Sequence, residues 1–241
     1  MHKERELMEQ STPVVAFICT HNACRSQIAE AVARTWAKDA FTPCSAGTSP
    51  VASVNDDALR ILRDRYGIDA SQQHPKTLAK LPTVDFVVTM GCGVACPALP
   101  ARHREDWGLE DPTGKGDAAF LATIDTIIER MLDLRERIEA GAIEGSPELV
   151  RRRAARRLKA LADPTRLHVM QLLAQHEELC ACKLLPHLGI GQPTLSYHMR
   201  LLCEEGLVIP RKDGRWMHYR LSRCALDTVR ETLNLRPESS C

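Results

Sequence analysis

The stretch VVAFICTHNACRSQIAEAVARTW, residues 14–36, decides the fold of the first half of the chain. Residues 14–19 are a short run of β-branched and aromatic side chains, which is typical of a buried strand. After Ser26, the side chains of Ile28, Val32 and Trp36 recur at helical spacing. We therefore expect a strand-to-helix turn between them, at the edge of a parallel sheet.

Strands and helices continue to alternate beyond this stretch. FTPCSAG (41–47) and VDFVVTM (84–90) have the pattern of strands, and DALRILRDRYG (57–67) and AAFLATIDTIIERMLDLRERI (118–138) that of helices. Such alternation predicts an α/β fold, a three-layer structure with a parallel sheet between helices. The small break GAIEGSP at 141–147 is interpreted as a linker between a domain at 13–140 and a second one at 148–236.

The second half is mainly helical. An apolar stripe is broken at Asp163-Pro164, where one helix should end and the next begin; it consists of Leu158, Leu161, Leu167, Met170 and Leu173. LLPHLGIGQPTLSYHMRLLCEEGLV (184–208) has the pattern helix, glycine turn, helix, and GLVIPRKDGRWMHYRLS (206–222) that of a hairpin. This combination predicts a winged helix-turn-helix domain.

Composition and charge place limits on the function. The chain has 241 residues, no run of about 18 apolar residues and no apolar signal segment, so we expect a cytoplasmic protein without membrane contact. Residues 1–147 carry 16 Lys and Arg against 21 Asp and Glu, and residues 148–241 carry 16 against 10, which gives net charges of −5 and +6. A basic second half favours a polyanionic partner. Ten cysteines in a cytoplasmic chain indicate thiol chemistry or metal binding rather than structural disulfides.

The loop CTHNACRS, residues 19–26, has the geometry of an oxyanion cradle. A cysteine at the end of a strand and an arginine at the start of a helix bracket five residues, and the backbone N–H groups of such a loop converge on one point. The same field stabilises a thiolate at Cys19. Arg25 is suited to bidentate binding of an oxyanion, Ser26 can hydrogen-bond the sulfur, and Asn22 tolerates a left-handed backbone. The expected oxyanion-binding residues are Thr20, His21, Asn22, Ala23, Cys24 and Arg25.

HNACRSQIAEA closely resembles the low-molecular-weight tyrosine phosphatases and, among them, the arsenate reductases. The similarity extends through SAG (45–47), VVTM (87–90) and DWGLEDPTGK (106–115), covering about residues 13–140. The resemblance implies that Asp111, followed by proline, is a general acid that must be protonated to act. It also implies that MGCGVACP supplies the resolving thiols Cys92 and Cys96, whereas Cys24 and Cys44 are expected to be structural.

For a reductase we expect three thiol steps. Cys19 attacks arsenate, Cys92 displaces arsenite to form a Cys19–Cys92 disulfide, and Cys96 takes over that disulfide and presents it to an external reductant. Because the spacing of Cys92 and Cys96 departs from the best-known members, the order of the relay stays open. Thioredoxin or a low-molecular-weight thiol is the expected reductant, with no tightly bound cofactor.

In the second half, Leu195, Met199 and Leu202 share one face of a helix and should pack inward. The residues expected to contact DNA lie on the opposite face of this helix and on the hairpin: Gln192, Thr194, Ser196, Tyr197, Arg200, Arg211, Lys212 and Arg215. ADPTR, LSYHMRLL, EEGLV and DGRWMHYRL together resemble the ArsR-type metalloregulators over residues 148–236. That family implies a homodimer on a palindromic operator.

ELCACKLL (178–185) resembles the arsenite-sensing members of that family, which makes Cys180 and Cys182 the expected arsenite ligands. Residues two apart point to nearly opposite sides of a regular helix, so both can bind one arsenic only if the helix start is irregular or unwinds. Unwinding there is one route to release from DNA. A third ligand, which could be Cys203, stays open because Leu185 stands where some relatives carry a thiol.

These features together predict a bifunctional arsenic-resistance protein, an arsenate reductase fused to an arsenite-responsive repressor with arsenite as inducer. Two alternatives stay open. The first is a regulator whose N-terminal domain binds an oxyanion without turnover, and the second is a tyrosine phosphatase fused to a DNA-binding domain.

Overall fold

The computed structural model describes residues 12–91, 99–139 and 155–223. The chain divides into two compact units. One contains the described residues up to Leu59 together with Ala70–Ile127, and the other contains Arg60–Asp69 and the described residues from Ile128 onward. The expected linker at 141–147 lies outside the described residues, so the domain limits 13–140 and 148–236 stay predictions.

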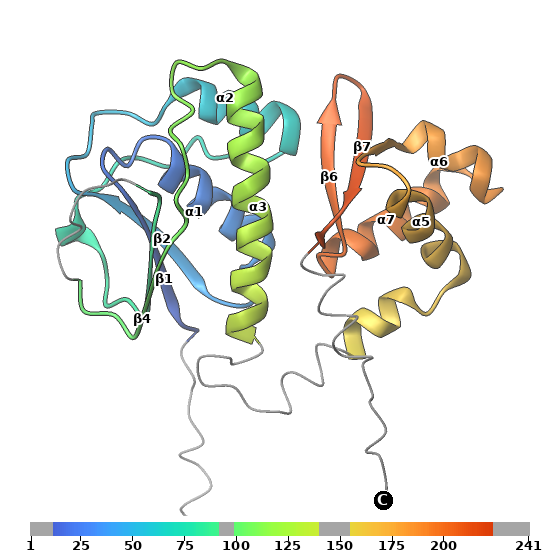
Figure 1. The fold of residues 1–241 in the computed structure, drawn as a ribbon, viewed down its shortest axis with the longest axis horizontal. Helices are drawn as coiled ribbons and strands as arrows, with labels where there is room; N and C mark the ends of the chain where they lie inside the picture. The colour runs from blue at the N-terminus through green and yellow to red at the C-terminus, as the bar shows by residue number, and fades with distance from the viewer. Residues whose placement is uncertain (1–11, 92–98, 140–154, 224–241) are drawn as a thin grey trace, which may run out of the picture. The chain divides into compact units, whose positions relative to one another are not determined.

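The first unit is built on a parallel sheet (Figure 1). Its strands, in the spatial order β2-β1-β3-β4, are β1 (Val14–Cys19), β2 (Thr42–Gly47), β3 (Phe86–Thr89) and β4 (His103–Asp106). Val15, Ala16 and Phe17 of β1 are fully buried, as expected for a central strand of a parallel sheet. The predicted α/β fold is confirmed, but β4 was not predicted, because its sequence HRED has no apolar side chain.

Helices flank this sheet. They are α1 (Arg25–Trp36), α2 (Asp56–Tyr66) and α3 (Asp117–Glu139), and a short 3-10 helix, η1, spans Leu78–Lys80. The helix α2 stops before Gly67, whose φ of 69° lies in the left-handed region that glycine adopts at little cost. The helices α2 and α3 start and end within one residue of the predicted segments, as expected for strongly periodic sequences.

The order of the strands determines where a ligand can bind. β1 pairs with β2 on one side and with β3 on the other, so the chain changes direction across the sheet at β1. In open α/β sheets, ligands bind beyond the carboxyl ends of the strands at such a switch point. The carboxyl end of β1 is Cys19, and Met90 follows the end of β3.

The second unit contains a helix-turn-helix with a hairpin (Figure 1). Residues 155–161 are helical, and after them come α5 (Pro164–Ala174), β5 (Leu179–Cys180), α6 (Ala181–Leu188), α7 (Gln192–Glu204), β6 (Val208–Asp213) and β7 (Trp216–Leu221). The three strands form an antiparallel sheet in the order β5-β7-β6. The winged helix-turn-helix is confirmed. The strand β5 was not predicted, because two residues are too few to show a period.

The start of α5 follows from its capping residues. The Asp163 side chain accepts a hydrogen bond from the Arg166 backbone N–H at 2.9 Å, and Pro164 occupies the first turn. This confirms the break predicted at Asp163-Pro164. The apolar stripe is confirmed only in part: Met170 and Leu173 are buried, whereas Leu167 is 46% exposed and Leu158 is 36% exposed.

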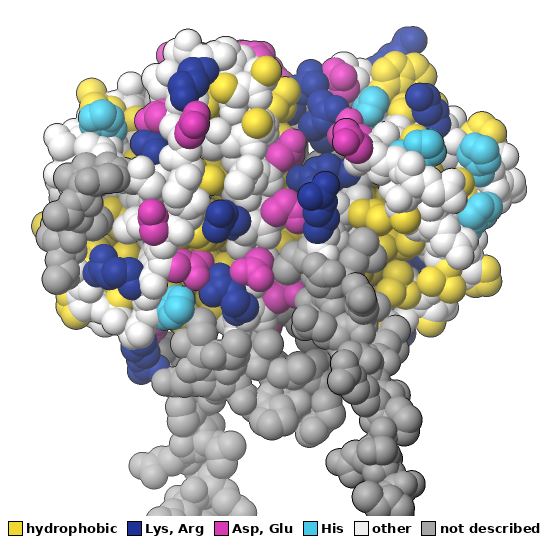
Figure 2. Space-filling view, viewed as in Figure 1, with side chains coloured by type: hydrophobic (Ala, Val, Ile, Leu, Met, Phe, Trp, Pro, Cys, Tyr) yellow, Lys and Arg dark blue, Asp and Glu magenta, His cyan; other side chains and the backbone are white. Residues whose placement is uncertain are grey.

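Hydrophobic side chains are visible on the surface of the molecule (Figure 2). In the second unit, the large exposed ones are Leu158, Leu167, Tyr197 and Trp216. Among the described residues, no helix combines the length and the apolar character that crossing a bilayer requires.

Candidate functional site

The loop between β1 and α1 holds its carbonyl groups on one side. The carbonyls of Thr20, His21 and Ala23 accept hydrogen bonds from backbone N–H groups in the segment 49–55, at 2.8 to 3.2 Å. In a trans peptide the C=O and the next N–H point in opposite directions, so the N–H groups that follow these carbonyls face the other side. The Asn22 N–H does so, donating to Cys19 Sγ at 3.1 Å.

Two backbone features allow this compact loop. Asn22 has a φ of 49°, the only positive φ of a non-glycine residue among those described, as predicted for this position. Gly47, at the end of β2, lies against the loop so closely that an added Cβ would be 2.7 Å from the Thr20 carbonyl oxygen and 2.9 Å from Asn22 atoms. A side chain at position 47 would therefore displace the loop.

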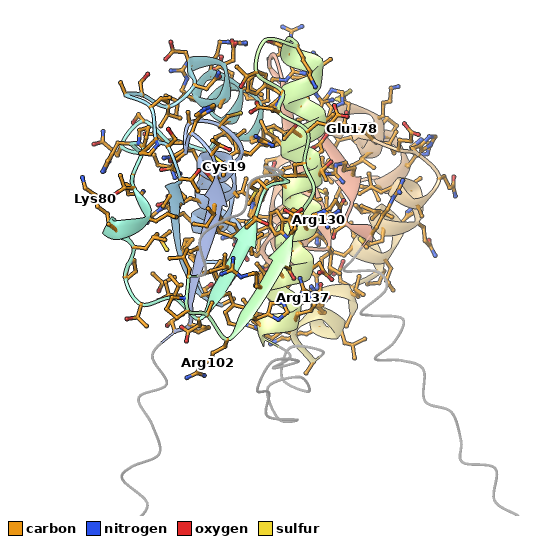
Figure 3. All side chains as sticks on the ribbon, turned by 60° about the vertical axis from the view of Figure 1, so that its left-hand side comes forward. Cys19, Lys80, Arg102, Arg130, Arg137 and Glu178 are labelled. Carbon is orange, nitrogen blue, oxygen red and sulfur yellow. A yellow bond between two sulfur atoms is a disulfide. The ribbon has the colours of Figure 1, made fainter. Side chains whose placement is uncertain are left out.

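Cys19 lies at the end of β1 (Figure 3), and two hydrogen-bonding groups lie next to its thiol. The residue is only 4% exposed. Its Sγ atom is 3.0 Å from Ser26 Oγ, which confirms the predicted hydrogen bond, in addition to the bond from the Asn22 N–H. Donors of this kind stabilise the charged form of a thiol, which is the nucleophilic form.

Arg25 uses part of its guanidinium to hold the neighbouring loops. Its Nη1 atom donates to the carbonyls of Met90 at 3.0 Å and Leu109 at 2.8 Å, and its Nη2 atom donates to Asp111 Oδ2 at 2.9 Å. Nε is buried and has no hydrogen-bond partner among the described residues. Of the five guanidinium N–H groups, one on Nε and one on Nη2 thus remain for a ligand. These two N–H groups, on Nε and Nη2, form the edge of the guanidinium that has no partner among the described residues, the orphaned edge, and an oxyanion with two acceptor oxygens fits it.

Asp111 lies beside Arg25, and its surroundings favour the charged form of its carboxyl. Burial alone would raise the pKa of its carboxyl; hydrogen bonds from Thr113 and the charges of Arg25 and His21 outweigh burial and lower the pKa below its ordinary value. A general acid must instead be protonated. The lowered pKa favours the ionised carboxylate, so a bound ligand would have to raise this pKa before Asp111 could act as a general acid.

Two further thiols of this unit, those of Cys24 and Cys44, are described by the structure. Burial raises the pKa of Cys24 to about 12 and that of Cys44 to about 12, so both are unreactive thiols near neutral pH. This agrees with their expected structural role. Cys92 and Cys96 lie outside the described residues.

A second candidate site lies at the start of α6. Cys180 is the last residue of β5 and the N-cap of α6, with an extended backbone, and its Sγ accepts a hydrogen bond from the Cys182 N–H at 3.2 Å. The two residues are joined as a disulfide, with their Cα atoms 5.2 Å apart. The helix start is thus irregular, and both sulfurs lie on one side of it without any unwinding.

The residues expected to face DNA are at the surface of α7 and the hairpin. Leu195, Met199 and Leu202 are buried, which confirms the predicted inner face of α7. The exposed residues are Gln192, Thr194, Ser196, Tyr197, Arg200, Lys212 and Arg215. The guanidinium of Arg200 lies over the ring of Tyr197, at 5.6 Å from its centre. A contiguous polar and aromatic face of this kind suits the major groove.

Arg211 is the exception among the expected DNA contacts. Its Nε donates to Glu178 Oε1 at 2.8 Å, and its Nη2 also binds the Glu178 carboxylate. His218 Nδ1 lies 3.4 Å from the same carboxylate. In this structure the Arg211 guanidinium is therefore paired with the Glu178 carboxylate beside the wing, and it would have to leave this partner to bind a DNA phosphate. Sequence reasoning missed Glu178, because a glutamate in a polar segment carries no signal of its partner.

Comparison with known proteins separates the two parts of the chain. Residues 14–142 match the family of low molecular weight phosphotyrosine protein phosphatases, and residues 163–209 match the bacterial regulatory proteins of the arsR family. An arsenate reductase of Brevibacillus brevis is 34% identical over 133 residues, which cover 53% of this chain and 97% of the relative. An arsenical resistance operon repressor of Staphylococcus aureus is 46% identical over 78 residues, which cover 32% of this chain and 74% of the relative.

The chain belongs to both families. A solved arsenate reductase in a phosphate-binding state is 31% identical, covers 52% of this chain and 98% of its own, and has a TM-score of 0.49. The loop after β1 lies within the part that matches the phosphatase family, and α7 lies within the part that matches the arsR family.

Proposed function

We propose that this protein reduces arsenate to arsenite in its first part and represses transcription in its second part until arsenite binds. The proposal rests mainly on one observation: the same chain contains both the oxyanion cradle of residues 19–26 and the Cys-x-Cys pair of Cys180 and Cys182. Cys19 with Arg25 offers a nucleophile and an orphaned anion-binding edge. Cys180 and Cys182 hold two sulfurs together beside the helix that precedes α7. Relatives of the two parts are named arsenate reductase and arsenical resistance operon repressor.

In the first step, the Cys19 thiolate attacks the arsenic of arsenate. A sulfur–arsenic bond forms and the bond from arsenic to one hydroxyl oxygen of arsenate breaks, and this hydroxyl takes a proton from Asp111 and leaves as water. The loop N–H groups and Arg25 hold the remaining oxygens. Arsenate in the cradle would bring negative charge near Asp111 and compete for Arg25, both of which raise the pKa of that carboxyl. The binding of arsenate would thus favour the protonated form of Asp111, which is the form that acts as a general acid.

In the second step, the Cys92 thiolate attacks Cys19 Sγ. A disulfide forms, the sulfur–arsenic bond breaks, and its electron pair stays on arsenic, which leaves as arsenite. Cys96 then attacks Cys92 and frees Cys19, and thioredoxin or a low-molecular-weight thiol reduces the Cys92–Cys96 disulfide. Met90, which lies two residues before Cys92 in the sequence, has its carbonyl 3.0 Å from Arg25 Nη1, and this supports a role at the site for the segment that follows β3.

The relay is tested by trapping. Purified protein is incubated with arsenate and no external reductant, its free thiols are blocked, and its disulfides are mapped by mass spectrometry. We expect Cys92–Cys96 in the wild type and Cys19–Cys92 in Cys96→Ser. Undiminished turnover in Cys92→Ser would contradict the relay as drawn.

The enzyme assay also separates the alternatives. Arsenate reduction that requires thioredoxin or a small thiol supports the reductase. Hydrolysis of an aryl phosphate without arsenate reduction would instead favour a phosphatase, and neither activity would favour a regulator that only binds an oxyanion.

For the second part, we propose that arsenite binds the reduced Cys180 and Cys182 and releases the protein from operator DNA. Soft thiolates suit trivalent arsenic, and their proximity lets one ion bridge both without rearrangement of the helix. Because a disulfide offers no thiolate, the bound state requires the reduced pair. We also propose a homodimer, because two recognition helices match a palindromic operator.

Operator release tests this part. The protein is reduced with a phosphine, because a thiol reductant would itself bind arsenite, and arsenite is added to the protein–operator complex. We expect release from the wild type and from Cys203→Ser, whose thiol is buried with a pKa of about 12, and no release from Cys180→Ser/Cys182→Ser. Equal release from all three would refute the sensor. Sedimentation of the complex measures whether two chains bind.

A further inference from the structure

The Asn22 side chain is fixed in one orientation by its neighbours. Its Oδ1 atom accepts from the Lys76 backbone N–H at 2.7 Å and from Gln27 Nε2 at 3.0 Å. A backbone N–H can only donate, so this atom must be the oxygen, and the amide cannot be reversed. The two protons of Nδ2 therefore go to Ser45 Oγ at 2.9 Å and to Ser26 Oγ at 2.8 Å.

This orientation determines what Ser26 can do. A serine hydroxyl has one proton, and Ser26 Oγ already accepts a hydrogen bond from Asn22. Its own proton is thus available to Cys19 Sγ, 3.0 Å away. A hydroxyl that donates to a thiolate stabilises it, whereas a hydroxyl turned elsewhere does not.

The other end of the network is a buried carboxylate. Glu30 is 1% exposed, and its Oε2 accepts from Ser45 Oγ at 2.6 Å and from Lys76 Nζ at 3.1 Å. Arg34 Nη2 binds Oε1 at 2.6 Å, but its side chain is 59% exposed against 20% for Lys76, so solvent screens Arg34 more. Burial alone would raise the pKa of Glu30; the hydrogen bonds from Ser45 and Arg34, with the charge and hydrogen bond of Lys76, lower it instead.

The charge on Glu30 sets the direction of the Ser45 hydrogen bond, and through it the strength of the acceptor that Ser45 offers to the Asn22 amide. As a carboxylate, Glu30 only accepts, so the Ser45 proton points to it and the Ser45 oxygen is open to Asn22. A protonated Glu30 could donate to Ser45, and the Ser45 proton would then compete with the Asn22 amide protons. The amide would lose one acceptor, and the donor that orients Ser26 would be weakened.

We propose that Lys76 is a positioning residue for Cys19, which fixes the Asn22 amide with its backbone N–H and keeps Glu30 ionised with its ammonium, so that Ser26 donates its proton to the nucleophile. The backbone of Lys76 also contacts the end of β2, because the Lys76 carbonyl accepts a hydrogen bond from the Gly47 N–H at 2.8 Å. The proposal rests on the role of Cys19 as the nucleophile proposed above, but its test uses no arsenate.

The test is the pH profile of Cys19 alkylation by iodoacetamide, followed on the Cys19 peptide by mass spectrometry. Lys76→Met removes the ammonium and keeps the backbone N–H, and we expect the midpoint of the profile to rise by roughly one pH unit. Lys76→Arg keeps the charge and should stay within about 0.3 unit of the wild type. Lys80→Met is the matched control: Lys80 is exposed and projects from the outer side of its unit, away from Cys19 (Figure 3).

A double-mutant cycle tests whether Lys76 acts through Glu30. Glu30→Gln removes the carboxylate charge and should raise the midpoint by a similar amount, and Lys76→Met in that background should then add less than about 0.3 unit. A full further shift in the double variant would show that Lys76 acts on Cys19 directly and would overturn the proposal. Glu30→Gln also tests it independently if Lys76→Met does not fold.

A purely structural role for Lys76 gives a different result. Both Lys76→Met and Lys76→Arg would then lower the temperature of thermal unfolding, and neither would move the midpoint, which overturns the proposal. Arsenate reduction is measured separately. Its absence in the wild type together with the expected alkylation profiles would contradict the reductase and leave the role of Lys76 intact.

Discussion

The two cysteine sites of this chain show opposite ways of arranging sulfur. Cys19 stands alone at the end of a strand, and its Sγ atom is held by a backbone N–H and a serine hydroxyl. Cys180 and Cys182 are instead bonded to each other through their sulfurs, and the Cys182 N–H donates a hydrogen bond to Cys180 Sγ at 3.2 Å. A nucleophile needs a single thiolate stabilised by donors, whereas a ligand site for a soft ion needs two sulfurs in contact. The groups around each sulfur atom, rather than the cysteine residue itself, therefore decide whether a site suits a nucleophile or an ion ligand.

The largest effect expected from this comparison is on turnover. Cys19→Ser should lower arsenate reduction by at least about 1000-fold, because the hydroxyl is a far weaker nucleophile, and should leave arsenite-induced operator release unchanged. Reductase assays and operator release on the same preparation measure both. Cys44→Ala, at a thiol outside the loop, is the control, with reduction within a few-fold of the wild type. Residual reduction of a tenth or more in Cys19→Ser would place the nucleophile elsewhere.

Removal of the general acid should have the next largest effect. We expect Asp111→Asn to lower kcat/KM for arsenate by about 100-fold, since the departing oxygen then lacks its proton donor. The pH profile of kcat/KM measures the loss. An unchanged profile would exclude Asp111 as the acid.

The same variant tests the ionised resting state. The folded-state pKa of Asp111 lies below its ordinary value of 3.8, so its contribution to stability is present above pH 3.8 and is lost as the pH falls through the folded-state pKa. Unfolding curves of the wild type and Asp111→Asn should therefore converge in acid. The difference will be small, because the carboxyl is 42% exposed.

A smaller effect is expected from the close packing at Gly47. Gly47→Ala places a Cβ 2.7 Å from the Thr20 carbonyl oxygen and should cost about 1–3 kcal/mol of stability in the first unit. Thermal unfolding monitored with and without operator DNA measures this, and operator affinity should be unchanged. A variant as stable and active as the wild type would show that the loop can move aside.

The smallest effect distinguishes two residues of the wing. Lys212→Ala should weaken operator binding a few-fold and reduce the slope of log affinity against log salt by about one, the signature of one phosphate contact. Arg211→Ala should leave that slope unchanged, because Arg211 binds Glu178. Titrations of operator at several salt concentrations compare the two. Equal slopes for both variants would mean that Arg211 leaves Glu178 on DNA.

Local patterns predicted most of the fold and only part of the sites. The strand before Cys19, the left-handed Asn22 and the buried face of α7 follow from residues close together in the sequence. The pairing of Asp111 with Arg25, and of Lys76 with Glu30, joins residues 86 and 46 positions apart, so no local sequence pattern predicts these pairs, their protonation or the direction of their hydrogen bonds. Cys180 was expected on a helix, because one N-cap residue with an extended backbone cannot be told from the helical residues that follow it.

The two-residue strand β5 also bears on the rate of the arsenite response proposed above. Cys180 pairs with His218 of β7, and His218 pairs with Arg211 of β6, so the proposed arsenite ligand Cys180 belongs to the same sheet as the wing. A strand of two residues can leave a sheet by breaking very few hydrogen bonds, without unfolding the helices around it. Arsenite could then act on the wing through a local opening event, so that loss of DNA contact would need far less time than unfolding of the domain.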